Sequence, residues 1–376
     1  MNTLPLHGKR RCASQMRGRV NPRPSSILPR AEQGGTEGKS VVAPFSRKIS
    51  SMIQYVVVAA IIFAASPAFA QGQITIDAKP ITYFDNRDKT LRRFGKLEFR
   101  GGLDLTSKAR EFGGVSGLHV YPDGARFIAV TDTGRWLRGR IVYSGSAPSG
   151  IADAEMAPIL GPDGKTLKAR GWYDTESLTE EAGTIYVSIE RVQRILKFDF
   201  GKSGFQSRGM PITVPADFRT MPSNGSLEAI ALVPKGLPLA GTLIVISEAA
   251  LDASGNNRAY FIGGPHPGSF TVKRSDNFDI TDCKILPNGD VLILERRFSL
   301  LGSGSRMRRI AAGDLRPGAL VDPPIIFSAD FGQQIDNFEG LGVHRTAAGE
   351  TVLTFVSDNN FFALQRTLLM QFTLVE

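Results

Sequence analysis

The sequence predicts an all-β protein, a single β-propeller of five or six blades preceded by a cleaved signal peptide. A short hairpin pattern, with a turn in the middle and a polar or acidic residue at each outer end, occurs five times. Equivalent residues recur at intervals of 47 to 63 residues, a length that suits a propeller blade of several short strands. Hydrophobic residues make up 42% of the chain and charged residues 22%, which is ordinary for a globular protein with a sizeable core.

The repeat is clearest in residues 278–296. There Asp282 precedes a short apolar segment, a Pro-Asn-Gly turn follows at 287–289, and the apolar run 291–294 ends on Glu295. This pattern predicts a β-hairpin with a carboxylate at each outer end. The other four units span residues 113–132, 174–191, 225–248 and 337–358.

Two positions of the unit carry most of the recurring polarity. The leading residues lie 60, 52, 54 and 57 residues apart and are Ser116, Glu176, Glu228, Asp282 and Glu339. The strand-ending acids lie 58, 58, 47 and 63 residues apart and are Asp132, Glu190, Glu248, Glu295 and Asp358. A β-sandwich gives no reason for this recurrence, whereas equivalent positions of all propeller blades meet around one axis. We therefore expect up to nine carboxylates near that axis.

The segments outside the five units decide the number of blades. Residues 74–84 and 97–105 are strand-like and are separated by a charged turn, and residues 368–374 form a last strand-like run. The two early segments are expected either to supply a closing strand to the last blade or to belong to a degenerate sixth blade.

The excess positive charge lies in the N-terminal region. Residues 1–70 contain ten Lys or Arg and two acidic residues, so they account for +8 of the formal net charge of +9. The remainder is nearly neutral, so we expect no nucleic acid partner.

That region ends in the pattern of a secretory signal peptide. Arg47 and Lys48 precede the apolar run 55–65, and Ala68-Phe69-Ala70 provides a cleavage site. We predict a mis-assigned or disordered leader at 1–46, a signal peptide at 47–70 and one propeller domain at 71–376. An uncleaved anchor is the alternative.

Cleavage would place the mature protein in the periplasm or outside the cell, without stable membrane insertion. It would also remove Cys12 and leave Cys283, which we expect to be buried. The true translation start and the oligomeric state stay open.

A ring of carboxylates needs positive charge to stay ionised. One source is Ca²⁺, which prefers oxygen ligands; the candidate metal ligands are Asp132, Glu190, Glu248, Glu295 and Asp358. The other source is arginine, and the candidates for binding phosphate are Arg135, Arg191, Arg296 and Arg297. Structural ion pairs are the alternative reading of each arginine. No H-E-x-x-H or G-x-S-x-G pattern supports a zinc site or a serine hydrolase.

Four segments resemble the repeated signatures of the phytase-like family, also called the esterase-like activity of phytase family: residues 112–118, 174–178, 227–230 and 337–341. They occur in the same order, and the resemblance extends over residues 94–376. It implies an exported bacterial protein whose recurrent acids, here Glu176, Glu228, Asp282 and Glu339, serve a phosphoester hydrolase. Ser116 departs from that pattern, so the first unit is expected to contribute less to a metal site.

The leading functional hypothesis is therefore an exported, Ca²⁺-dependent phosphoric ester hydrolase that acts on a small phosphorylated substrate. A non-catalytic propeller that binds a ligand or protein, and a lactone or sugar-ester hydrolase on a similar propeller, are the alternatives. The substrate and the number of metal ions stay open.

Overall fold

The computed structural model describes residues 72–299 and 302–376. The predicted leader, the signal peptide and Cys12 lie outside these residues. Within them, no helix is long and apolar enough to cross a membrane.

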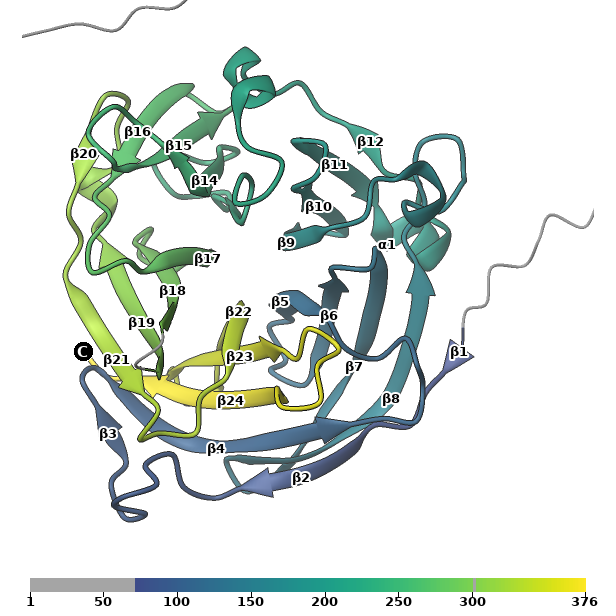
Figure 1. Ribbon diagram of the computed structural model, residues 1–376, viewed down its shortest axis with the longest axis vertical. Coiled ribbons are helices and arrows are strands. Elements are labelled where there is room, and N and C mark those ends of the chain that lie inside the picture. Colours follow the sequence, from purple (N-terminus) through teal and green to yellow (C-terminus); the bar gives the residue numbers. More distant parts are fainter. Residues whose placement is uncertain (1–71, 300–301) are drawn as a thin grey trace, which may run out of the picture. The chain divides into compact units, whose positions relative to one another are not determined.

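Five sheets, antiparallel except for one short parallel strand, are arranged around a central axis as the blades of a propeller (Figure 1). Blade 1 contains, in spatial order from the outside, β1 (Gly72–Gln73), β8 (Ala147–Pro158), β7 (Arg135–Ser144), β6 (Arg126–Thr131) and β5 (Val115–Val120). Blade 2 contains β12 (Met210–Pro211), β11 (Arg194–Asp199), β10 (Thr184–Ile189) and β9 (Thr175–Glu181). The prediction of a propeller is confirmed, and the number of blades is five.

Blades 3 and 4 follow the same plan. Blade 3 contains, from the axis outward, β13 (Ala229–Leu232), β14 (Leu243–Leu251), β15 (Asn257–Ile262), β16 (Gly268–Val272) and the parallel strand β20 (Leu320–Val321). Blade 4 contains β17 (Asp279–Ile285), β18 (Val291–Ser299), β19 (Gly302–Ile310) and β21 (Ile325–Asp330). The turn between β17 and β18 depends on Gly289, whose φ of 91° is favourable only for glycine.

Blade 5 joins the two ends of the described chain. Its inner strands are β22 (Asn337–Arg345), β23 (Thr351–Asp358) and β24 (Thr367–Leu374), and β4 (Leu97–Thr106) and β2 (Asp77–Ile81) complete it from the N-terminal side. The short β3 (Arg93–Phe94) pairs with β4. The first of the two expectations for residues 74–105 is therefore the correct one, since they close the last blade and form no sixth.

Helical structure is confined to short connections in the described chain. It consists of α1 (Phe200–Ser203) and the 3₁₀ turns η1 (Lys168–Arg170), η2 (Gly204–Gln206), η3 (Ala216–Thr220) and η4 (Ala312–Asp314).

Apolar side chains fill the space between neighbouring blades. Trp136 of β7, for example, is fully buried, and its ring lies 5.1 Å from that of Phe198 in β11 of the next blade. Cys283 of β17 is also fully buried, as predicted, in the cluster between blades 3 and 4. These clusters hold the five blades in a fixed arrangement.

The inner strands approach one another closely around the axis. A Cβ on Gly117 of β5 would lie 2.9 Å from the carbonyl oxygen of Glu176 in β9, and one on Gly340 of β22 would lie 3.0 Å from that of Ser116. Only glycine fits at such contacts. The ring of inner strands therefore brings the leading residues of different blades together.

Candidate functional site

The leading residues are directed toward the axis by breaks in the strand pairing. The register shifts at Ser116 in β5, Glu176 in β9 and Glu339 in β22. A bulge of this kind leaves an extra residue outside the regular ladder and changes the direction of its side chain. The strand-ending acids of the neighbouring strands, such as Asp132 and Glu190, follow directly after the paired segments.

These side chains line a cavity of about 150 Å³ at the centre of the propeller. Eight carboxylates and a single arginine face it, together with one serine and two asparagines: Asp132, Asp174, Glu176, Glu190, Glu228, Glu248, Glu339, Asp358, Arg296, Ser116, Asn224 and Asn360. Seven of the nine predicted acids are thus brought together, from four different blades.

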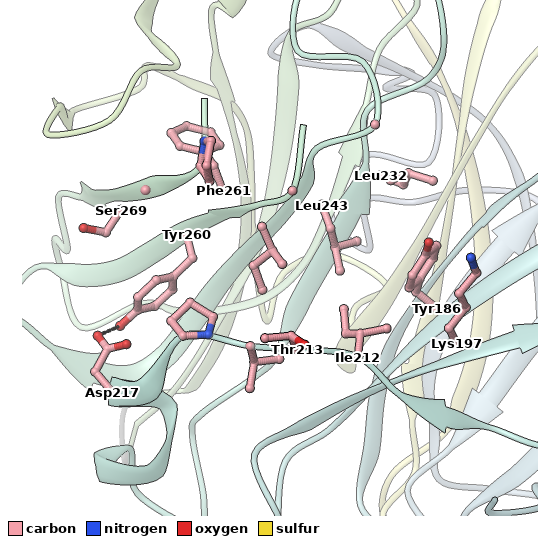
Figure 2. Close-up of a pocket in the computed structure, with 17 residues that line it drawn as sticks. Tyr186, Lys197, Ile212, Thr213, Asp217, Leu232, Leu243, Tyr260, Phe261 and Ser269 are labelled. Carbon is pink, nitrogen blue, oxygen red and sulfur yellow. Dashed lines mark hydrogen bonds between the residues drawn. The ribbon is translucent and has the colours of Figure 1, made fainter. Parts of the chain in front are cut away.

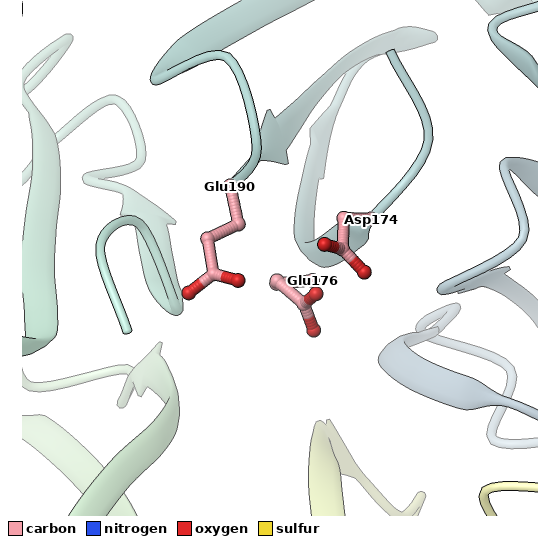
Figure 3. Close-up of side chains that lie close together, drawn as sticks. All are labelled: Asp174, Glu176 and Glu190. Atoms are coloured by element: carbon pink, nitrogen blue, oxygen red, sulfur yellow. The ribbon is translucent and has the colours of Figure 1, made fainter. Parts of the chain in front are cut away.

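Two groups of three carboxylates are close enough to share a cation. One is formed by Asp174, Glu176 and Glu190, and Figure 3 shows these three side chains turned toward one another. The other is formed by Glu190, Glu228 and Glu248. In each group, one ligand oxygen per residue lies within 4.8 Å of the others. Glu190 belongs to both groups, so two ions held there would share a ligand.

Burial makes these acids unusually weak. Loss of hydration raises the pKa of Glu248 and of Glu339 to about 7, even though Arg296 acts in the opposite direction. Burial likewise raises the pKa of Asp358 to about 7 and that of Asp132 to about 6. For Glu176 and Glu228, burial and the neighbouring carboxylates together hold the pKa well above its usual range. Without a nearby cation, ionisation of these acids is therefore energetically unfavourable.

Among the described residues, Arg296 is the one cation that lines the cavity. Its guanidinium lies 3.2 Å from Glu248 and 3.3 Å from Glu339, and it donates a hydrogen bond of 2.8 Å to Asn337. Burial alone would lower the pKa of Arg296, but the surrounding carboxylates raise it above its ordinary value. Arg296 therefore stays protonated, and it offsets only a fraction of the negative charge.

The fourth blade departs from the predicted alignment by one residue. The register shift of β17 falls at Thr281, because Ile280 pairs with Glu295 and Asp282 with Leu294. Thr281 thus occupies the position of Glu176 and Glu339, and Arg296 occupies that of Glu190. Since successive side chains of a strand point to opposite sides, this slip removes Asp282 and Glu295 from the cavity.

Asp282 instead forms a buried polar link between blades. Lys284 donates to both of its carboxylate oxygens at 2.7 Å, Ser177 of β9 donates at 2.7 Å, and the backbone N–H of Leu341 in β22 donates at 2.8 Å. Asp282, which was expected among the catalytic acids, therefore lies outside the central cavity, because the one-residue slip turns its side chain toward the neighbouring inner strands.

Glu295, which was expected among the metal ligands, is also buried elsewhere. Two arginines of β19, Arg306 and Arg308, pair with it, the second at 2.6 Å. All three side chains are almost fully buried. This carboxylate is therefore already neutralised by the protein.

The other predicted arginines lie around the cavity at different distances from it. Arg191 pairs with Asp174 at 3.4 Å and is 48% exposed, so it stands at the edge of the site. Arg135 lines a neighbouring cavity. Arg297 packs over the ring of Phe278 and donates to the carbonyl of Asp276, so it does not line the central cavity.

One acid of the cavity, Asp174, was not among the predicted site residues. It precedes Glu176 by two positions and has a φ of 74°, a left-handed conformation that aspartate tolerates better than most residues. Its position two residues before Glu176 was the sequence feature from which its place in the site could have been predicted.

A larger cavity lies elsewhere, on the side of the propeller. It has a volume of about 810 Å³ and lies between blades 2 and 3. Figure 2 shows its mainly apolar lining and the 2.7 Å hydrogen bond from Tyr260 to Asp217. The residues that line it and the residues that line the central cavity are different.

The fold and the central cavity define a five-bladed propeller with an acidic, oxygen-lined site on its axis. The chain belongs to the phytase-like family: the family model described as esterase-like activity of phytase matches residues 110–361. No curated protein matches the chain.

The chain is also similar, at low identity, to solved structures. Glutaminyl cyclase from Myxococcus xanthus is 12% identical, with a TM-score of 0.39 over 81% of this chain and 98% of the other. The PQQ-bound aldose sugar dehydrogenase from Streptomyces coelicolor is 12% identical, with a TM-score of 0.37 over 72% of this chain and 97% of the other.

Proposed function

We propose that this protein is an exported phosphoric ester hydrolase that depends on Ca²⁺ and works at the central cavity. The observation that carries the proposal is the convergence of eight carboxylates and one arginine on a cavity of about 150 Å³. Membership of the phytase-like family and the signal-peptide pattern before residue 71 support it.

The residues present suit a hard divalent cation. All side chains that could ligate it offer oxygen, the ligand type that Ca²⁺ prefers. Oδ1 of Asp132 is buried without a hydrogen-bond partner among the described residues. Burial raises the pKa of Glu248 and of Asp358 to about 7, so a bound cation would favour their ionised forms. The two groups that share Glu190 would hold the ions. When bound, Ca²⁺ supplies charge neutralisation for a phosphate and lowers the pKa of a bound water.

Arg296 would bind the phosphoryl group directly. Its planar guanidinium provides several N–H donors in a geometry that matches phosphate oxygens. It is held at 3.2 Å by Glu248 and at 3.3 Å by Glu339, so its position is fixed before a substrate arrives. Such preorganised positive charge stabilises the transition state of phosphoryl transfer.

The same two glutamates are suited to moving a proton. A carboxyl group with a pKa of about 7 exists in both protonation states near neutral pH. General acid and base catalysis is most efficient under that condition. Glu339 would therefore protonate the leaving group or accept a proton from water, while Arg296 keeps its orientation.

The experiment is a phosphate-release assay on the mature protein from residue 71 onward. Phosphomonoesters and phosphodiesters are tested with Ca²⁺ and with EDTA, using wild type, Glu176→Gln, and Asp322→Asn, an acid outside the cavity, as the control. We expect turnover that EDTA and Glu176→Gln abolish and that Asp322→Asn leaves unchanged. Absence of EDTA-sensitive phosphate release would refute the proposal. Ester or lactone cleavage without phosphate release would instead favour the lactonase alternative.

A further inference from the structure

A second cavity lies beside the acidic one and has the opposite charge. Its volume is about 510 Å³, and the charged residues that line it are Arg110, Arg135, Lys168 and Glu111. Three cations thus face one carboxylate, whereas the central cavity has eight carboxylates and one cation. Consecutive residues line the two cavities. Thr133 and Phe361 of the basic cavity directly follow Asp132 and Asn360 of the acidic one in the sequence.

The cations of this basic cavity are largely available to a ligand. Arg135 contacts Glu111 at 3.5 Å, a long ion pair whose acid is 52% exposed. In the part of the chain that the structure describes, Arg110 and Lys168 form no ion pair. Exposed pairs of this length contribute little to stability, so binding of an anion to Arg135 in place of Glu111 would cost the fold little.

Phe361 gives the cavity an aromatic wall. Its side chain is 46% exposed, and its ring approaches Gly113 so closely that a Cβ there would lie 2.9 Å from Cε1. The ring is thus fixed from one side and open on the other. Pro158 adds further apolar surface.

The backbone that presents Phe361 is strained. Asn360 and Phe361 have φ values of 47° and 50°, and a bulky residue such as phenylalanine is rarely found in this left-handed region. The loop is held by hydrogen bonds from the N–H of Asn360 to Asp358 at 2.7 Å and from the N–H of Gly114 to Asn359 at 3.2 Å. The strained pair places Asn360 in one cavity and Phe361 in the other.

We propose that the basic cavity is a separate binding site for an anion that carries a flat apolar ring, such as an aryl phosphate or aryl carboxylate. The three cations would bind the anionic group, and the exposed face of Phe361 would stack against the ring. A volume of about 510 Å³ is within the range of small-molecule sites and far larger than a bare phosphate requires. The proposal goes beyond the hydrolase function and does not depend on it.

The test is calorimetric titration of phenylphosphonate and methylphosphonate into metal-free protein in EDTA, where the acidic cavity cannot recruit an anion through a cation. We expect phenylphosphonate to bind at least tenfold more tightly than methylphosphonate. The double variant Arg135→Gln, Lys168→Gln should weaken phenylphosphonate binding at least tenfold, and Phe361→Ala should remove the preference for the ring. Arg316→Gln and Phe331→Ala, which lie outside the cavity, should bind like wild type.

Equal affinity for the two phosphonates would refute the claim that the site recognises an apolar ring on the ligand. Absence of binding, or binding that the double variant does not weaken, would overturn the site itself. Circular dichroism of each variant confirms that it is folded. Failure of the phosphate-release assay leaves these measurements unaffected, so the two proposals are refuted by different results.

Discussion

Replacing Glu248 by glutamine should stabilise the metal-free protein at alkaline pH, although Glu248 belongs to the candidate site. The pKa of its carboxyl group rises from 4.5 to about 7 on folding. Folding therefore favours the protonated form, and this contribution to stability is complete below about pH 4.5 and lost as the pH rises through 7. Each tenfold change in proton affinity is worth about 1.4 kcal/mol, so the ionised group costs roughly 3 kcal/mol at pH 8. Glutamine has the shape of the protonated acid and avoids that cost.

Thermal unfolding in EDTA at pH 5 and pH 8 measures the effect. At pH 8, Glu248→Gln should unfold roughly 5 °C above wild type, since an unfolding entropy of about 2.1 cal/mol/K per residue makes 1 kcal/mol worth about 1.6 °C for a domain of about 300 residues. At pH 5 the difference should fall to roughly a quarter of its value at pH 8, because the folded protein then keeps the carboxyl group protonated while the unfolded chain is only partly ionised. Added Ca²⁺ should then stabilise wild type more than the variant, because the variant lacks one ligand. Asp322→Asn, an exposed control, should show no such pH dependence. A variant that is no more stable than wild type at pH 8 in EDTA would refute the reasoning.

The remaining predictions concern the scaffold and are checked by chemical denaturation with calcium binding measured in parallel. Asp282→Asn should lower the free energy of unfolding by about 3–5 kcal/mol, because it leaves the Lys284 ammonium without its buried partner, and calcium affinity should be unchanged. Glu295→Gln should cost a similar amount, because Arg306 and Arg308 lose their shared carboxylate; a calcium affinity that falls with stability would contradict its assignment as structural. Leu103→Ala, in the fully buried part of β4, should cost about 2–5 kcal/mol, and a loss below 1 kcal/mol would argue against a tightly closed fifth blade.

The recurring hairpins were enough to predict the propeller, because a turn and an alternating strand pattern are local properties. The early strands had two expected places, in the last blade or in a sixth one. The choice depended on whether β4 pairs with β24, more than 250 residues away in the sequence. A local sequence pattern cannot predict a pairing between segments that lie so far apart.

The candidate site was predicted for four blades and misaligned in one. Matching the nearest acids placed Asp282 and Glu295 in the series, whereas the structure aligns Thr281 and Arg296. The apolar residues indicate the correct alignment. In each unit an apolar residue stands two positions after the residue that the structure aligns at the leading position: Leu118, Leu178, Ile230, Cys283 and Leu341. Burial of that residue fixes the register, while the charge beside it varies from blade to blade.

The sequence contains no local pattern from which the burial of these carboxylates, and hence their raised pKa values, could be predicted. Asp132, Glu190 and Asp358 look like ordinary acids at strand ends when each is read alone. Their effect on one another arises only when the ring of blades closes, because the distances that matter join different repeats.

Closure of blade 5 also bears on how the chain reaches its folded state. β4 is among the earliest described strands to leave the ribosome, yet its partner β24 is among the last. Until β24 is made, β4 has an unpaired edge, and such edges are prone to pair with other chains. Contacts between such distant segments form slowly. Pairing of β4 with β24, which closes the ring of blades, is therefore expected to be a late event in folding.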